Sequence, residues 1–196
     1  LANWQWNRAV EMKKPIAQNQ SILPIDSLVS PNGSIEPSAL GQKVSLEGEY
    51  LSNWVAPHQD GNKSWAVGLL KTRDNAAILV VRGIMDSNEL PLGQSKIVGY
   101  VMPPQSEDVA ENSGNQLSRV DSSLFVSKTQ LPLYAPYIQV ISEDPATGIE
   151  ILPFKVSSKV PGFYWQHISY VVIWFLFALT AIYLMIYQRW LDKVEP

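Results

Sequence analysis

His167 is one of two histidines in this chain, and it stands where a long apolar segment begins. At about 100° per residue in a helix, Tyr170 and Trp174 fall on the same face as His167. A neutral imidazole is a good axial ligand for haem iron, and an aromatic rim shields a porphyrin from water. The spacing therefore makes these three residues a candidate haem-binding set. The alternative is an interfacial histidine that only hydrogen-bonds lipid headgroups or a loop carbonyl.

Few other residues suggest chemistry. His58 lies in a Pro-His-Gln-Asp-Gly segment typical of a solvated turn, and one histidine cannot build a closed metal centre unaided. The chain has no cysteine, which excludes thiol catalysis and thiolate metal sites. Because Gly-x-Ser-x-Gly, phosphate-loop and His-Glu-x-x-His motifs are also missing from the sequence, no enzyme class is indicated. The acidic residues Glu107, Asp108 and Glu111 are interpreted as a solvated face.

Arg82 is a further candidate, because it directly follows the apolar run 76–81. A buried guanidinium needs a carboxylate, a carbonyl or a propionate as its partner. The alternative is an arginine at the end of a strand that lies in water. The formal net charge of −3 gives no basic field that would favour nucleic acid.

The element that positions His167 is predicted to be a transmembrane helix over residues 167–190. Residues 168–187 carry no charge, and about 20 apolar residues span the hydrocarbon core of a bilayer. Trp165 and Trp190 flank the segment, where amphipathic aromatic side chains favour the membrane interface.

One face of this helix is predicted to contact another protein. Within about 60° of His167 lie two alanines that permit close approach of a second helix, and two longer side chains. These four residues are Ala178, Ala181, Met185 and Gln188. The opposite side is aliphatic, as lipid requires, with Val172, Ile173, Leu176 and Leu179. Tyr183 and Tyr187 also lie on the aliphatic side, so the division is imperfect.

About 160 residues precede the helix, enough for one domain with a hydrophobic core. Alternating or continuous apolar runs predict six strands. They cover residues 44–50, 65–70, 76–81, 96–102, 137–141 and 149–152. Turn and cap residues further predict a hairpin turn at 72–75, a short capped helix at 121–127 and a mobile polar loop at 105–116.

The chain is therefore predicted to be an α+β membrane protein with an antiparallel β-rich domain, barrel-like or sandwich-like. This domain covers residues 21–160. Residues 161–166 form an interfacial linker, and residues 191–196 form a tail beyond the membrane helix.

Residues 1–20 are predicted to form a helix that continues from a membrane helix upstream of Leu1. Trp4 and Trp6 precede a basic amphipathic segment, a pattern common where a helix leaves a bilayer. The alternative is that both tryptophans belong to the core of a soluble helix.

Motifs along the whole chain resemble those of the Surfeit locus protein 1 family. Its Trp-Gln-x-x-Arg…Lys motif corresponds to residues 4–8 and 13–14, and its Val-x-x-x-Gly-x-Tyr strand to residues 44–50. A later glycine strand corresponds to residues 98–100. The second membrane helix of the family begins His-x-x-Tyr-Ala-x-x-Trp-Phe, matched by His167, Tyr170, Trp174 and Phe175, with Val171 in place of the alanine.

The resemblance has departures. Residues 80–85 match the family's Val-Asn-Arg-Gly-Trp-Val motif without its asparagine and tryptophan. Residues 131–137 resemble actinobacterial members more than mitochondrial ones.

The resemblance implies an assembly factor for haem-copper cytochrome c oxidase, with an extracytoplasmic β-rich domain between two membrane helices. It implies that His167 handles haem a during maturation of oxidase subunit I. Tyr170 and Trp174 would line the porphyrin, and Arg82 would receive a propionate. The expected location is the plasma membrane of a bacterium, and residues 191–196 would form a cytoplasmic tail. Orientation rests on the resemblance, because basic residues on the two sides of the span balance.

Two other functions stay open from the residues. The chain could be a permanent accessory subunit of a respiratory oxidase or supercomplex that holds subunits together without contacting haem. It could also be a membrane-anchored enzyme with a barrel pocket, which the lack of a nucleophile–base pair disfavours.

Overall fold

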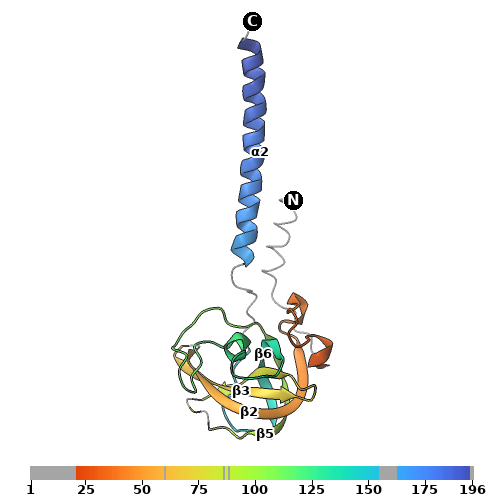
Figure 1. Cartoon of the computed structure of the whole chain (residues 1–196), viewed down its shortest axis with the longest axis vertical. Coiled ribbons are helices and arrows are strands. Elements are labelled where there is room, and N and C mark those ends of the chain that lie inside the picture. Colours follow the sequence, from red (N-terminus) through yellow and green to blue (C-terminus); the bar gives the residue numbers. More distant parts are fainter. Residues whose placement is uncertain (1–20, 60, 86, 88, 155–162, 195–196) are drawn as a thin grey trace. The chain divides into compact units, whose positions relative to one another are not determined.

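The computed structural model describes residues 21–59, 61–85, 87, 89–154 and 163–194 (Figure 1). At both ends of the last helix, residues 163–167 and 191–194 are described for their backbone alone. The chain divides into two units, Ile16–Val156 and the combination of Leu1–Pro15 with Ser157–Pro196, and each is described by itself. The predicted helix over residues 1–20 and the start of the predicted linker at 161–162 lie outside the described residues.

The first unit is a six-stranded sheet that closes on itself. Its strands follow the order β1-β2-β3-β4-β6-β5, and β2 also pairs with β5, which closes five of them into a barrel. The strands are β1 (Leu23–Pro24), β2 (Lys43–Gln59), β3 (Lys63–Thr72), β4 (Ala77–Ile84), β5 (Gly93–Met102) and β6 (Leu133–Asp144). The predicted β-rich domain is therefore confirmed in its barrel form. Small closed barrels of five strands include the OB-fold, and the architecture alone assigns no function.

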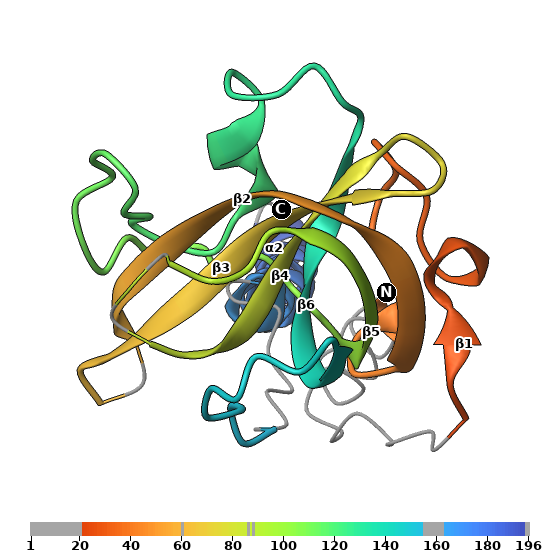
Figure 2. The same cartoon turned by 90° about the horizontal axis from the view of Figure 1, so that it is seen from below.

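The long strand β2 closes the barrel because it pairs on both edges. Lys43 to Tyr50 pair with β5, and the strand from Gly48 onward pairs with β3. A register shift between Tyr50 and Ser52 marks a bulge, which bends a strand and increases its twist. Figure 2 shows the resulting arch of β2. Gly48 permits this closure, since a Cβ there would lie 2.2 Å from the carbonyl oxygen of Lys71.

The prediction of a purely antiparallel sheet was wrong in one respect. β4 and β6 run parallel, as do the short β1 and β2. Strands that alternate in direction can close into a ring only if their number is even. A five-stranded barrel therefore requires at least one parallel pair, and β4–β6 supplies it.

Two other differences concern the last predicted strands. β6 is longer than the predicted strand at 137–141. Residues 149–152 form no strand, and only the isolated bridge between Ile84 and Glu150 joins this segment to the barrel. The predicted hairpin turn is confirmed, with the Thr72 amide donating to the Ala76 carbonyl at 2.8 Å between β3 and β4.

The continuous apolar run in β4 serves two hydrophobic clusters, because successive side chains of a strand point to opposite faces. Ile78 and Val80 belong to the cluster inside the barrel, to which all five barrel strands contribute. Leu79 and Val81 belong to a second cluster, with Phe125 from η3 (Ser122–Phe125). The segment between β5 and β6 therefore covers the outer face of β4.

The second unit contains α2 (Phe163–Val194), a helix of 32 residues without an internal glycine or proline. Within it, Ile168–Trp190 is long and apolar enough to cross a membrane, with a mean hydropathy of 2.2. At about 1.5 Å per residue, this stretch exceeds a hydrocarbon core of about 30 Å. The helix starts four residues before its predicted start at residue 167, and it continues beyond the predicted end at residue 190 into the segment predicted to be a tail.

Candidate functional site

The first candidate site is the face of α2 predicted to bind haem and a partner helix. His167 lies in the helix, and its side chain is outside the described set. Tyr170 and Trp174 are both exposed, and the Trp174 ring meets the edge of Phe177 at 6.2 Å between centroids. The predicted partner-face residues Ala178, Ala181, Met185 and Gln188 are exposed as well.

No part of the apolar window of α2 is buried within the described structure. An exposed apolar helix of this length needs lipid or another protein around it. The face is therefore exposed, and it carries the two amphipathic aromatic rings of Tyr170 and Trp174.

The second candidate site surrounds Arg82, which points into the barrel and is only 3% exposed. The interpretation of Arg82 as an arginine in water was wrong. Its Nη2 and Nε donate to Oε1 and Oε2 of Glu143 at 2.7 and 3.2 Å. Nη1 donates to the Asn53 side chain at 3.1 Å and to the Pro91 carbonyl at 2.9 Å. The predicted need for a carboxylate or a carbonyl partner is thus confirmed.

Four strands meet at this ion pair. Asn53 comes from β2, Arg82 from β4, Ser95 from β5 and Glu143 from β6. The Ser95 hydroxyl donates to Glu143 at 3.2 Å, and the Asn53 amide donates to the Leu90 carbonyl at 2.7 Å. We call Asn53, Arg82, Ser95 and Glu143 the barrel plug. A bidentate pair with these additional bonds satisfies charges that would otherwise be costly to bury.

An aromatic ring completes the surroundings of Arg82. The guanidinium lies 3.9 Å from the centroid of the Tyr50 ring, a cation–π geometry. Gly68 makes room for that ring, since a Cβ there would lie 2.4 Å from it. The Tyr50 hydroxyl is buried without a hydrogen bond of acceptable geometry. Burial, and then the negative charge of Glu143, raise the pKa of Tyr50 well above its usual range.

The barrel plug differs from the predicted propionate site. A propionate could pair with Arg82 only by displacing Glu143, so that role stays a prediction. Sequence reasoning found Arg82 from its place after an apolar run but missed Glu143, Asn53 and Ser95. Glu143 ends a strand in a Ser-Glu-Asp sequence that resembles any solvated strand end, so no local pattern distinguishes it.

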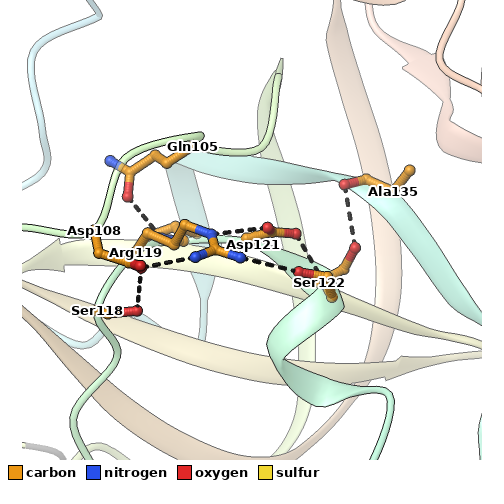
Figure 3. Close-up of polar contacts among 9 residues, drawn as sticks. Gln105, Asp108, Ser118, Arg119, Asp121, Ser122 and Ala135 are labelled. Carbon is orange, nitrogen blue, oxygen red and sulfur yellow. Dashed lines mark hydrogen bonds and ion pairs between the residues drawn. The ribbon is translucent and has the colours of Figure 1, made fainter. Parts of the chain in front are cut away.

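A third polar cluster lies on the segment between β5 and β6 (Figure 3). Arg119 donates to Asp108 at 2.7 Å and to Asp121 at 2.9 Å. Asp108 also accepts from the Ser118 hydroxyl at 2.5 Å. Asp121 caps η3 by accepting from the Ser123 amide, which confirms the predicted capped helix. We call Asp108, Ser118, Arg119 and Asp121 the loop clamp.

The charges of the loop clamp stabilise one another. Hydrogen bonds from Ser118 and then Arg119 hold the pKa of Asp108 below its usual value. For Asp121, partial burial opposes ionisation, but bonds from the Ser123 amide and from Arg119 outweigh it and lower the pKa. The same carboxylates, Asp121 first, raise the pKa of Arg119.

The loop at 105–116, predicted to be mobile, is tied to the barrel at several points. The Gln105 amide donates to the Val120 carbonyl at 3.0 Å, and its side-chain amide donates to Gln59 at 2.8 Å. The Val55 amide donates to the Asn115 carbonyl at 2.9 Å. These bonds and the loop clamp serve to hold the segment over the second hydrophobic cluster.

A pocket of about 490 Å³ lies beside β2, β5 and β6. Glu47 at its edge contacts Arg73 and also Lys96, the latter at 3.1 Å. The hydrogen bond from Lys96 is the largest cause that lowers the pKa of Glu47. Among the described residues no group of three or more His, Cys, Asp or Glu side chains could hold a metal ion. His58, predicted to lie in a solvated turn, is exposed but belongs to the last residues of β2, where its ring contacts Asn62 at 2.7 Å.

Comparison with known proteins places these features in a family. A sequence model of the SURF1 family matches residues 1–179, which includes the barrel and α2 up to the middle of its apolar stretch. No curated protein matches the chain. The SURF1 family is a membrane-bound family of assembly factors linked to cytochrome oxidase. The match covers most of the chain, so this protein belongs to the SURF1 family.

Proposed function

We propose that this protein is a non-enzymatic assembly factor that binds subunit I of haem-copper cytochrome c oxidase. In this proposal it assists the insertion or stabilisation of haem a. α2 anchors it in the plasma membrane of a bacterium, and the barrel lies on the extracytoplasmic side.

The observation that carries the proposal is the extent of the family match. The match runs from residue 1 to residue 179 and so includes His167, Tyr170 and Trp174 on α2. A family of oxidase assembly factors acts on a membrane complex, and an exposed apolar helix is the part of this chain suited to contact one.

The residues of α2 fit one wall of a haem site. Tyr170 and Trp174 are exposed. They follow His167 by three and seven residues, so all three positions share one side of the helix. A single imidazole suffices as one axial ligand, so the absence of a larger ligand cluster among the described residues is compatible with haem. When bound, haem a supplies the redox-active iron that the oxidase requires.

In this arrangement His167 would hold the iron through a ring nitrogen, and the two aromatic side chains would line the porphyrin and exclude water. The rest of the pocket must come from the partner, because one helix face cannot enclose a porphyrin. A shared site of this kind is suited to transfer, since haem is never fully enclosed by this chain alone.

The two histidines of the chain provide a matched test. The full chain is expressed in cells that make haem A and purified in mild detergent, and reduced-minus-oxidised spectra are recorded. We expect a substoichiometric haem a signal that His167→Ala abolishes. His58→Asn is the control, because His58 is exposed at a positive φ of 56° that asparagine tolerates. An equal haem signal in both variants, or none in the unchanged protein, would contradict the haem role.

The composition of the co-purified complex separates an assembly factor from a permanent subunit. An assembly factor is expected to bring down trace amounts of immature subunit I. Recovery of the mature oxidase subunits in equal amounts, without haem bound to this chain, would instead establish the accessory role.

A further inference from the structure

Three aromatic side chains near the end of α2 form a stacked row that the proposed haem function does not use. The Tyr183 and Tyr187 rings lie 6.1 Å apart with 14° between their planes. The Tyr187 and Trp190 rings lie 6.5 Å apart with 25° between their planes. All three are exposed, and we call them the aromatic row.

The aromatic row lies on the side of α2 away from the predicted haem and partner face. At about 100° per residue, its members fall about 140° to 200° around the helix from His167. Leu176 and Leu179 continue the same side towards the middle of the apolar stretch, and both are exposed. The alanines that permit close helix approach, Ala178 and Ala181, lie on the opposite side.

The chemistry of the aromatic row favours the boundary between acyl chains and headgroups. Tyrosine and tryptophan each combine a large apolar ring with a polar tip, and they concentrate at membrane interfaces for that reason. Arg189 is exposed between Tyr187 and Trp190 in the sequence. Its long side chain can extend to the phosphate layer, so the charge of this turn also complements lipid.

We propose that the aromatic row fixes the depth and the rotation of α2 in the bilayer. Tyr187 and Trp190 dock into the lipid headgroup boundary, and Tyr183, about 10 Å from Trp190 along the helix axis, stacks on Tyr187 from the acyl-chain side. This inference rests on the proposed function, because the rotation matters only if the opposite face meets an oxidase subunit. The row then turns Tyr170, Trp174 and Ala178 towards the protein partner. It also accounts for the two tyrosines on the otherwise aliphatic side.

The depth of α2 is tested with lipid alone. Because the chain has no cysteine, Gln188→Cys provides a single site for a nitroxide label in the full chain. The protein is reconstituted in phosphatidylcholine–phosphatidylglycerol vesicles, and label depth is measured from its access to oxygen and to a nickel chelate. The row variant carries Tyr183→Leu, Tyr187→Leu and Trp190→Leu, and the control carries Phe175→Leu and Phe177→Leu in mid-span.

We expect the row variant to move the label towards the bilayer centre and the control to leave its depth unchanged. Leucine preserves both helix formation and apolar character, so the helix itself is retained. The same label depth in the row variant as in the unchanged chain would overturn the proposal.

The rotation is tested by crosslinking from Ala178→Cys and Leu176→Cys in membranes that contain the oxidase. We expect crosslinks to an oxidase subunit from position 178 and not from 176, with this preference lost in the row variant. Crosslinks from Tyr183→Cys or Tyr187→Cys to protein would overturn the lipid assignment. A depth shift without oxidase crosslinks from any position would support the anchor and contradict the proposed function. Crosslinks from position 178 that persist in the row variant, without a depth shift, would contradict the anchor and support the proposed function.

Discussion

The barrel plug and α2 reverse the usual distribution of polar and apolar groups in opposite ways. The plug buries a guanidinium and a carboxylate in the barrel, where both side chains are almost wholly hidden from water. α2 exposes rows of leucine, isoleucine and aromatic side chains. The plug is stable because the chain itself supplies every strong partner. α2 has no such partners among the described residues, so its surroundings must come from outside.

The difference teaches where to look for function. A charge pair that the fold fully satisfies is suited to hold four strands in place. An apolar surface that the fold leaves open is suited to bind lipid or another protein. We therefore expect mutations in the plug to act on stability, and mutations on α2 to act on membrane position and partner binding.

The largest effect is expected when one member of the plug loses its charge. Glu143→Gln leaves the buried Arg82 charge uncompensated and should lower the free energy of unfolding by about 3–5 kcal/mol. The measurement is urea unfolding of the full chain in detergent, followed by tryptophan fluorescence.

The control for this change is Glu150→Gln, which removes a carboxylate from an exposed pair. Lys63 and Glu150 are 3.3 Å apart, with side chains 50% and 65% exposed. Exposed pairs contribute about 0–1 kcal/mol. Similar losses of unfolding free energy for both variants would show that burial does not make the Arg82–Glu143 pair more important to stability than an exposed pair. Arg82→Met combined with Glu143→Leu should recover much of the loss, because it removes both charges together.

A matched truncation compares the two apolar environments. Leu79 in β4 is 0% exposed and Leu179 in α2 is 62% exposed. Leu79→Ala should cost about 2–5 kcal/mol in the same assay, because it leaves a cavity. Leu179→Ala should leave barrel unfolding within about 0.5 kcal/mol of the unchanged chain. A large loss for Leu179→Ala would show that the barrel depends on this part of α2.

Acid should weaken the loop clamp, because protonation removes the charges of its two carboxylates. The folded pKa values of Asp108 and Asp121 are lowered. Their contribution is therefore fully present above the unfolded pKa of about 3.9, and it is lost as pH falls through the folded values. Hydrogen exchange at residues 105–121 should rise as pH is lowered below about 4, after correction for intrinsic rates.

Asp121→Asn is the variant that checks this assignment. It should reduce the acid sensitivity of the segment, and an unaltered pH profile would contradict it. At neutral pH the loss of charge should cost about 1 kcal/mol or less, because asparagine still caps a helix well.

The smallest effect is expected at Tyr50. Its hydroxyl is buried without a well-formed hydrogen bond, so Tyr50→Phe should be neutral or should stabilise the chain by up to about 1 kcal/mol. The stacked contact with Arg82 is retained. A loss of more than about 1 kcal/mol would indicate that the hydroxyl donates to Glu143.

Much of the molecule follows from local sequence patterns. The apolar stretch of α2, the hairpin turn at 72–75 and the Asp121 cap are each specified by residues close together in the chain. The order of short motifs along the chain also indicates its family. A local pattern can specify such features, because hydropathy, turn conformation and capping act over a few residues.

Tertiary structure decided the pairings between distant residues. Arg82 finds Glu143, 61 positions away, only because closure of the barrel brings β4 and β6 side by side. The same closure makes that pair parallel, since five strands cannot all alternate in a ring. It also leaves residues 149–152 with one bridge in place of a strand. Sequence alone determined which segments are apolar and where they turn. The ring of strands decided which charges meet, because the paired residues lie on segments far apart in the sequence that no local pattern connects.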